Sequence, residues 1–260
     1  MTAGKYTTRL GSGQGIVQET FILLDLWNRG MNVASLYQFA LQSGRFQRLT
    51  ARRLRNLVAE GFASRFLGDG TPAVYLKALK QTLNGKEFVQ LLFLYTCRAN
   101  RILYDFVQEV YWNAYSSGRA TLSNEESTEF VVRANQEGKT TSPWSKNMIE
   151  RVAGYLTGTL ADLSLLEDGS KRARKILPYR MESRVAIFLA YDLHFAGNGD
   201  NAVLSHTDWA LFGMDRSDVL DELKRQALRG WLIVQSAGDA TRIGWQYRTM
   251  EELTDAFVKG

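Results

Sequence analysis

The chain has 260 residues, of which 45% are hydrophobic and 23% charged, and its formal net charge is +5. This composition excludes a disordered chain and allows one large domain or two ordinary ones, of which we favour two. Only three prolines favour helices, and a single cysteine excludes an intramolecular disulfide and a multi-cysteine zinc site. The most hydrophobic run, 88–97, is far shorter than the roughly 20 residues that a membrane-spanning helix needs. The N-terminus is polar and lacks the apolar core of a secretory signal. We therefore expect a cytoplasmic protein.

The basic residues are unevenly distributed. Residues 1–70 contain nine Lys and Arg against four Asp and Glu, and residues 171–180 contain five basic residues and no acidic one. Because the net charge is modest, a polyanionic partner has to be inferred from such local clusters. Both clusters are therefore candidate nucleic-acid contacts.

Hydrophobic spacing predicts three helices in the N-terminal quarter: one over 16–27, one that Asn32 caps, and one from Thr50 to a stop at Gly61. The last two resemble a helix-turn-helix, although roughly eight residues separate them where the tight motif uses three or four. A period of 100° per residue puts the basic side chains of the third helix opposite its apolar stripe. This face predicts DNA contact, with a merely solvated arginine face as the alternative.

A glycine-rich segment, 11–15, precedes these helices. It resembles a phosphate-binding loop, but no Lys-Ser/Thr pair follows it and no strand clearly precedes it. The pattern therefore favours a flexible lead-in.

Residues 86–116 keep a helical apolar register throughout. A helix of that length would span roughly 45 Å, enough to link two lobes as a structural spine. The linker-like stretch 116–120 follows it, so we place a domain boundary at residue 118. The expected domains are 1–118, helical with the helix-turn-helix-like unit, and 119–260, winged-helix-like.

The second half predicts further helices and two hairpins. Helices are expected near 124–136, from Ser142-Pro143 onward, over 183–195 and near 208–212, and a tail helix begins at the capping box Thr249/Glu252. Asp168-Gly169 predicts a hairpin whose second strand carries the basic segment 171–180.

Residues 215–247 have the layout of a winged helix. A charged amphipathic helix begins at a capping Asp215 and ends at Gly230, and a hairpin follows over 231–247. In the last strand Arg242 lies opposite the apolar face. A solvated hairpin is an equal alternative. With the hairpin at 168–169, helix-then-hairpin occurs twice, which indicates a weak internal repeat of two winged-helix-like units.

Motifs for catalysis are not visible. The two histidines, His194 and His206, lie far from any metal-ligand spacing, so each is interpreted as a buried or capping side chain. The acidic run Glu125, Glu126 and Glu129 suits the start of a helix without acid–base chemistry. We predict no cofactor, no metal and no enzymatic activity.

Four segments resemble the BrxA family of bacterial BREX bacteriophage-exclusion systems: YTTRLGSGQGIVQET (6–20), SPWSKN (142–147), HTDWALFG (206–213) and GWLIVQSAGDATRIGWQYR (230–248). The resemblance implies a cytoplasmic, mostly helical DNA-binding protein with helix-turn-helix-like lobes. It also implies BREX partners, namely a methyltransferase, a phosphatase-like protein and ATPases. The family supplies no consensus active site.

The leading hypothesis is a non-enzymatic component that binds double-stranded DNA through phosphate contacts from basic helices and wings, with little sequence preference. The fold class is mainly α, with two helical lobes and short β-hairpin wings. The candidate DNA contacts are Arg45, Arg48, Arg52, Arg53, Arg55, Asn56, Lys171, Arg172, Arg174, Lys175, Lys224, Arg225, Arg229 and Arg242.

Two other hypotheses remain open. The chain is a protein–protein scaffold if its basic faces meet acidic proteins and Trp144, Trp209 and Trp245 anchor partners. Basic helical faces also suit RNA. An enzyme is the least favoured class.

Overall fold

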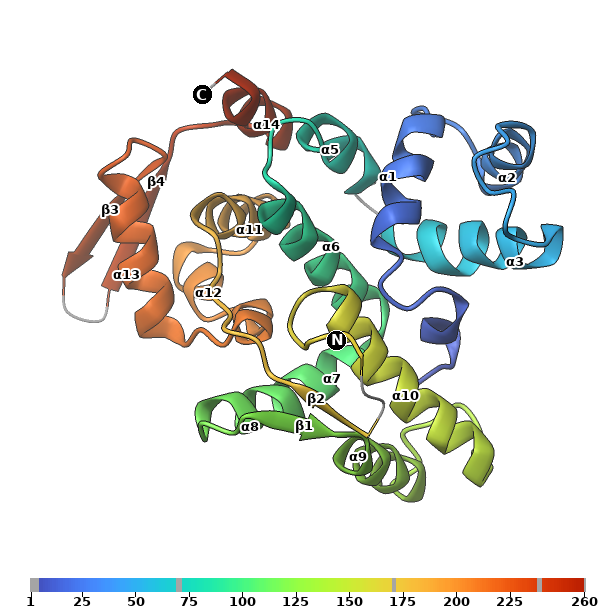
Figure 1. Cartoon of the computed structure of the whole chain (residues 1–260). Coiled ribbons are helices and arrows are strands. Elements are labelled where there is room, and N and C mark those ends of the chain that lie inside the picture. The colour runs from blue at the N-terminus through green and yellow to red at the C-terminus, as the bar shows by residue number, and fades with distance from the viewer. Residues whose placement is uncertain (1–4, 69–71, 170–171, 238–239, 260) are drawn as a thin grey trace. The chain divides into compact units, whose positions relative to one another are not determined.

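A computed structural model describes residues 5–68, 72–169, 172–237 and 240–259. Most of the described chain is helical, with two short antiparallel strand pairs, so the expectation of a mainly α fold with short β elements is confirmed (Figure 1). The described helices include none that combines the length and the apolar character needed to span a bilayer.

The chain forms two compact units. Unit 1 comprises residues 1–77 and 92–179, and unit 2 comprises residues 78–91 and 180–260. The expected boundary at 118 lies inside unit 1, so these units do not follow the division 1–118 and 119–260. The chain instead passes between the units within α5 (Pro72–Leu79), within α6 (Gly85–Ala99) and after Tyr179.

The remaining elements of unit 1 are η1 (Arg9–Ser12), α1 (Val17–Leu26), α2 (Val33–Gln42), α3 (Ala51–Asn56), η2 (Leu57–Ala63), α4 (Ser64–Phe66), α7 (Arg101–Phe106), η3 (Val107–Tyr111), α8 (Trp112–Ser116), β1 (Thr121–Ser123), α9 (Asn124–Gln136), α10 (Lys146–Asp162) and β2 (Ala173–Lys175). The remaining elements of unit 2 are α11 (Ser183–Phe195), α12 (Asp200–Leu204), η4 (Thr207–Phe212), α13 (Arg216–Ala227), β3 (Leu232–Ala237), β4 (Ala240–Trp245) and α14 (Met250–Lys259).

The N-terminal helices begin where their caps predict. Asn32 accepts a hydrogen bond from the Ser35 N–H, and Thr50 accepts one from the Arg53 N–H. The expected stop at Gly61 is wrong, because the helical path continues through the π-helical η2 and α4 to Phe66. A Cβ on Gly61 would lie 3.3 Å from Ile16 Cδ1, so this glycine serves close packing, not helix termination.

The expected single helix over 86–116 is also wrong. Asn100 has φ −130° and ψ 90°, which ends α6 and restarts the chain as α7. Its side-chain amide donates to the Thr96 carbonyl, and such competition for backbone groups favours a helix boundary. The apolar register continues across the break, because buried side chains flank Asn100 on both sides.

The hairpin expected at Asp168-Gly169 is present as a short antiparallel contact, and residues 170 and 171 of its turn lie outside the described residues. The bridge Leu166 to Ile176 joins its two arms, and the Glu167 N–H donates to the Lys175 carbonyl beside it. β2 also pairs with β1, which is about fifty residues earlier in the chain. Among the described residues, a hairpin of two full strands follows a helix in unit 2, whereas the one after α10 is reduced to this short contact, so the expected repeat stays a prediction. The helix expected from Ser142-Pro143 begins instead at Lys146, with Ser145 as its cap.

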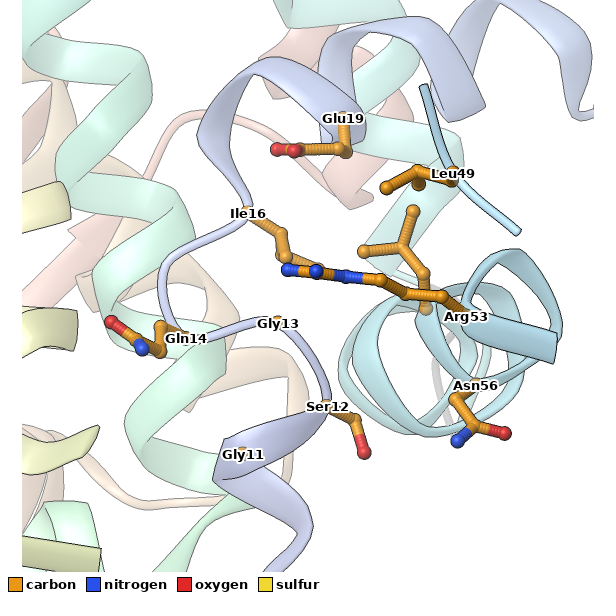
Figure 2. Close-up of a pocket in the computed structure, with 10 residues that line it drawn as sticks. Gly11, Ser12, Gly13, Gln14, Ile16, Glu19, Leu49, Arg53 and Asn56 are labelled. Carbon is orange, nitrogen blue, oxygen red and sulfur yellow. The ribbon is translucent and has the colours of Figure 1, made fainter. Parts of the chain in front are cut away.

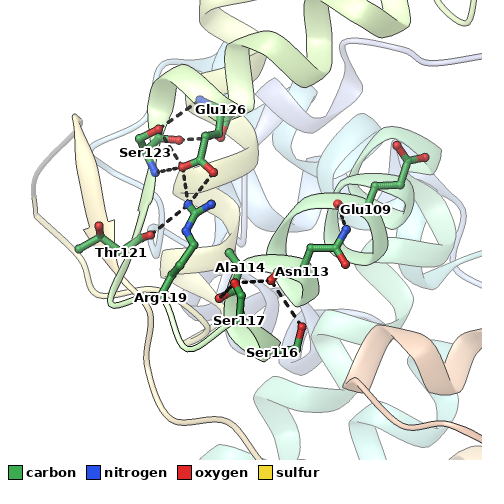
Figure 3. A network of polar contacts seen from close by, with 10 residues as sticks. Glu109, Asn113, Ala114, Ser116, Ser117, Arg119, Thr121, Ser123 and Glu126 are labelled. Carbon is green, nitrogen blue, oxygen red and sulfur yellow. Dashed lines mark hydrogen bonds and ion pairs between the residues drawn. The ribbon is translucent and has the colours of Figure 1, made fainter.

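A polar network fixes β1 against the start of α9 (Figure 3). Ser123 and Glu126 form a capping box, and Arg119 donates to the Glu126 carboxylate and to the Thr121 carbonyl. The linker-like stretch after α8 is thus a structured turn, in which the Ser117 hydroxyl donates to the Asn113 carbonyl.

In unit 2 the predicted helix and hairpin are confirmed. Asp215 caps α13 in a capping box with Asp218, and Gly230 takes the left-handed φ of +82°. β3 and β4 pair in register, with Leu232 opposite Trp245. The Asp200 carboxylate accepts from the Ile243 N–H and the Trp245 indole N–H, which ties the hairpin to α12.

The Glu126 network predicts a pH-dependent contribution to stability. Burial raises the pKa of Glu126, but hydrogen bonds from Arg119 and Ser123 outweigh it and hold the pKa below its ordinary value. The pKa of Glu126 is lower in the folded protein than in the unfolded chain, where it is roughly 4.3. The ionised carboxylate therefore stabilises the fold at pH values above 4.3, and this stabilisation is lost as the pH falls through the folded pKa. We expect Glu126→Gln to lower the free energy of unfolding by about 1 kcal/mol at pH 7, with a smaller difference below about pH 4.

Urea unfolding as a function of pH measures this difference. Glu125→Gln, an exposed neighbour in the same helical turn, is the control and should change stability by less than about 0.5 kcal/mol. Equal losses in both variants at every pH would contradict the role of the network.

Candidate nucleic-acid interface

The outer face of α3 presents a row of basic and polar side chains. Arg52, Arg53, Arg55 and Asn56 are exposed, while Leu54 is buried beneath them, as the helical period predicts. The Arg55 guanidinium lies 5.3 Å from the centroid of the Tyr37 ring, a cation–π arrangement that holds this side chain on the surface.

Arg45 and Arg48 lie on the segment before α3 and are also exposed. Arg45 forms an ion pair with Asp25 at 3.2 Å, whereas Arg48, Arg52 and Arg53 form none with any described residue. Three guanidinium groups within one turn-and-helix segment are therefore uncompensated by contacting carboxylates, which suits them to phosphate.

A cavity of about 240 Å³ lies beside this face (Figure 2). Arg53 extends across it toward Ile16, and Asn56 lies near Ser12. Its walls come from the glycine-rich segment, the start of α1, the segment before α3, α3 itself and the first residue of η2. They are Gly11, Ser12, Gly13, Gln14, Ile16, Glu19, Leu49, Arg53, Asn56 and Leu57.

The glycine-rich segment is packed against α10, so the expectation of a flexible lead-in is wrong. The Gly15 N–H donates to the Asp162 carboxylate at 2.9 Å, and a Cβ on Gly15 would lie 2.3 Å from Asp162 Cβ. A Cβ on Gly11 would lie 2.5 Å from the Tyr155 ring. Burial raises the pKa of Asp162, an effect that the Gly15 N–H opposes.

Backbone strain marks the exit of this segment. Gln14 and Ile16 have φ values of +55° and +41°, and a β-branched residue in the left-handed region is an outlier that surrounding contacts must hold in place. The sequence pattern did not identify Ser12, Gln14, Glu19 and Leu49 as cavity residues. The only signal was the glycine run, which shows a need for close approach without naming the partner.

The second predicted cluster, 171–175, has only some of its basic side chains exposed. Lys171 lies outside the described residues, and Arg172 and Lys175 are exposed. The side chain of Arg174 is 11% exposed and contacts Asp168 and the Glu167 carbonyl at 3.3 Å each. Its Nε is buried without a hydrogen-bond partner among the described residues, so the side chain of Arg174 is less accessible than those of its neighbours, and its contact with DNA stays a prediction.

In unit 2 the candidate contacts Lys224, Arg229 and Arg242 are exposed. Arg225 is also exposed, but its guanidinium is paired with Glu222 of the same helix. The exposed carboxylates of Asp218 and Asp221 share α13 with Lys224, which weakens the field that a phosphate would meet there.

The net charge differs between the two units. Unit 1 has 21 Lys and Arg against 14 Asp and Glu, and unit 2 has 11 against 13. Their net charges are therefore +7 and −2, which together give the +5 of the chain. The attraction for a polyanion is concentrated in unit 1.

The histidines and tryptophans have structural positions. His206 accepts from the Asp208 N–H as the cap of η4, and His194 stacks on Trp245 at 4.2 Å. Trp144 and Trp209 are buried, so neither presents its ring on the surface of the protein as it stands. Among the described residues, no three His, Cys, Asp or Glu side chains group as metal ligands.

A model of the BrxA family matches residues 4–192. The chain belongs to the BrxA family. Membership in the BrxA family indicates a role associated with BREX systems and confirms the resemblance inferred from sequence. The matched range covers nearly all of unit 1, including the segment 6–20, while the similar stretches 206–213 and 230–248 lie beyond it. No curated protein matches the sequence.

The packing of the glycine-rich segment predicts opposite outcomes for two glycines. Gly15→Ala inserts a methyl group against Asp162 Cβ and should lower the free energy of unfolding by about 1–3 kcal/mol. Gly154→Ala, inside α10 with nothing within 4 Å of the added atom, should raise it by about 0.5–1 kcal/mol.

Denaturant unfolding of the two variants beside the wild type gives both values. If Gly15→Ala is as stable as the wild type, the segment does not depend on its close contact with α10.

Proposed function

We propose that this BrxA-family protein is a non-enzymatic, cytoplasmic component of a BREX phage-defence system that binds double-stranded DNA, mainly through unit 1. The observation that carries the proposal is the exposed row on and before α3, where Arg48, Arg52 and Arg53 have no ion-pair partner among the described residues. The +7 charge of the unit supports the choice of a polyanion.

Several local features make this row suitable for phosphates. The Thr50 cap and the buried Leu54 hold α3 in place, so its arginines extend from a fixed base. Guanidinium groups bind phosphate oxygens in a bidentate manner, and each neutralised phosphate releases counterions to solution. The binding is driven by the backbone of the duplex, with weak sequence preference, because phosphates carry no sequence information.

Unit 2 makes a smaller contribution in this proposal. Its helical segments α11, α12, η4 and α13 are followed by the β3–β4 hairpin, an order similar to that of a winged helix. Lys224, Arg229 and Arg242 are exposed on its surface. Its negative net charge reduces the electrostatic attraction that these three residues exert.

A second candidate function is docking of another protein on unit 2. Leu228 is 90% exposed at the end of α13, and Ile233 on β3 is 50% exposed. Exposed aliphatic side chains on a weakly charged surface favour a protein partner over DNA. The methyltransferase, phosphatase-like protein and ATPases of a BREX system are the proposed partners. RNA is the third alternative as a ligand. A competition assay between duplex DNA and duplex RNA distinguishes RNA binding from DNA binding.

Two matched triple variants test the proposal. The first variant changes Arg48, Arg52 and Arg55 together to Gln and should weaken duplex binding at low salt. It should also reduce the slope of the logarithm of the binding constant against the logarithm of the salt concentration by about 2–3, since each phosphate contact contributes about 0.9. Lys224, Arg229 and Arg242 changed together to Gln remove the same charge and should reduce the slope by less than about 1. Fluorescence anisotropy across a salt series measures both.

Circular dichroism of each variant checks the fold, and the duplex should be recovered uncut after incubation with divalent cations. A larger loss from the unit 2 variant would place the interface on the hairpin unit. A slope unchanged by either variant would reject electrostatic DNA binding through these residues.

A further inference from the structure

A second cavity adjoins the one beside α3. The second cavity, of about 440 Å³, shares Glu19 and Leu49 with the first, and it is lined by Gln18, Glu19, Ile22, Gly44, Arg45, Phe46, Gln47, Arg48 and Leu49. Both lie within unit 1. The combined space falls within the roughly 300–1,000 Å³ that small-ligand sites occupy.

One end of this combined site suits an anion. Arg53 crosses the first cavity, and its guanidinium has no ion-pair partner among the described residues (Figure 2). Asn56 adds an exposed side-chain amide. Gly11 and Gly13 line this end too, but a Cβ on either would meet Tyr155 or Ile16, so both glycines serve the packing of the wall.

The middle of the site carries a negative charge. The Glu19 carboxylate is half-buried, lines both cavities and has no hydrogen-bond partner among the described residues. It would repel a bare phosphate. A ligand that fits both Arg53 and Glu19 therefore joins an anionic group to neighbouring hydroxyl donors, and a carboxylate that binds ribose hydroxyls is a recurring solution in nucleotide sites.

The far end is more apolar. Ile22, Phe46 and Leu49 contribute apolar walls there, and Gln18 and Gln47 add amide groups that can hydrogen-bond a base edge. Phe46 is buried, so this wall is fixed by the packing of unit 1. The positively charged rim comes from Arg45 and Arg48.

We propose that this combined site binds a ribonucleoside phosphate, with the phosphate at Arg53 and Asn56, the ribose at Glu19 and the base between Ile22, Phe46 and Leu49. The order of anion, hydroxyl and apolar subsites along the cavity carries the proposal. The same chemistry has two sources, a free nucleotide or a nucleotide of an RNA strand. The site goes beyond duplex binding, since a free ligand needs no DNA.

Isothermal titration calorimetry of the full chain with AMP tests the site. Adenosine, inorganic phosphate and deoxy-AMP are titrated separately for comparison. AMP should bind more tightly than any of the three, and Arg53→Gln should weaken AMP by about tenfold, the equivalent of about 1.4 kcal/mol. Glu19→Gln should remove the preference for AMP over deoxy-AMP while leaving or raising the affinity for phosphate. Arg29→Gln removes an exposed charge of unit 1 away from both cavities and should leave AMP binding unchanged.

The source of the nucleotide is decided by competition. A short RNA that displaces AMP with higher affinity supports a strand as the ligand, and AMP that binds more tightly than the RNA supports a free nucleotide. The proposal is overturned if inorganic phosphate binds as tightly as AMP, or if AMP does not bind at millimolar concentration. It is also overturned if Arg29→Gln weakens AMP binding as much as Arg53→Gln does. Duplex binding is measured separately with the unit 1 triple variant, which retains Arg53, so failure here leaves the DNA proposal standing.

Discussion

The contact between the glycine-rich segment and α10 is the constraint on which the candidate site of unit 1 depends. The Gly15 N–H binds the Asp162 carboxylate, and the absence of a side chain on Gly15 lets the two backbones approach. Ile16 then begins α1 in the left-handed region and packs against Gly61 of η2. One anchored segment thus sets the start of α1, the wall of the cavity and the position of the helix that carries Arg53.

Charge distribution separates the roles of the two units. Arg48, Arg52, Arg53 and most of the positive charge belong to unit 1, whereas unit 2 pairs Arg225 internally and carries exposed Leu228 and Ile233. Positive charge next to polar cavities suits a phosphate ligand, and apolar side chains on a weakly charged surface suit a protein. A component that holds DNA with one unit and another BREX protein with the other would combine both hypotheses drawn from the sequence.

Local signals in the sequence predict local structure well. The spans of α9 and α11 and the caps Asn32 and Asp215 follow from side chains within one turn of the feature that they define. Long-range choices were not predictable. β2 pairs with β1 because of tertiary packing, and the side chain of Arg174 contacts Asp168, although its neighbours in sequence suggested an exposed basic strand. The basic face of α3 was predicted, but its cavity was not, since a glycine run does not identify what approaches it.

Amide hydrogen exchange of the protein with and without duplex DNA tests the central claim most directly, because it locates the interface without altering any residue. Binding through unit 1 predicts slower exchange over residues 45–57 and at the start of α1, with little change in α13 and the β3–β4 hairpin. Slower exchange confined to α13 and the hairpin would contradict the account.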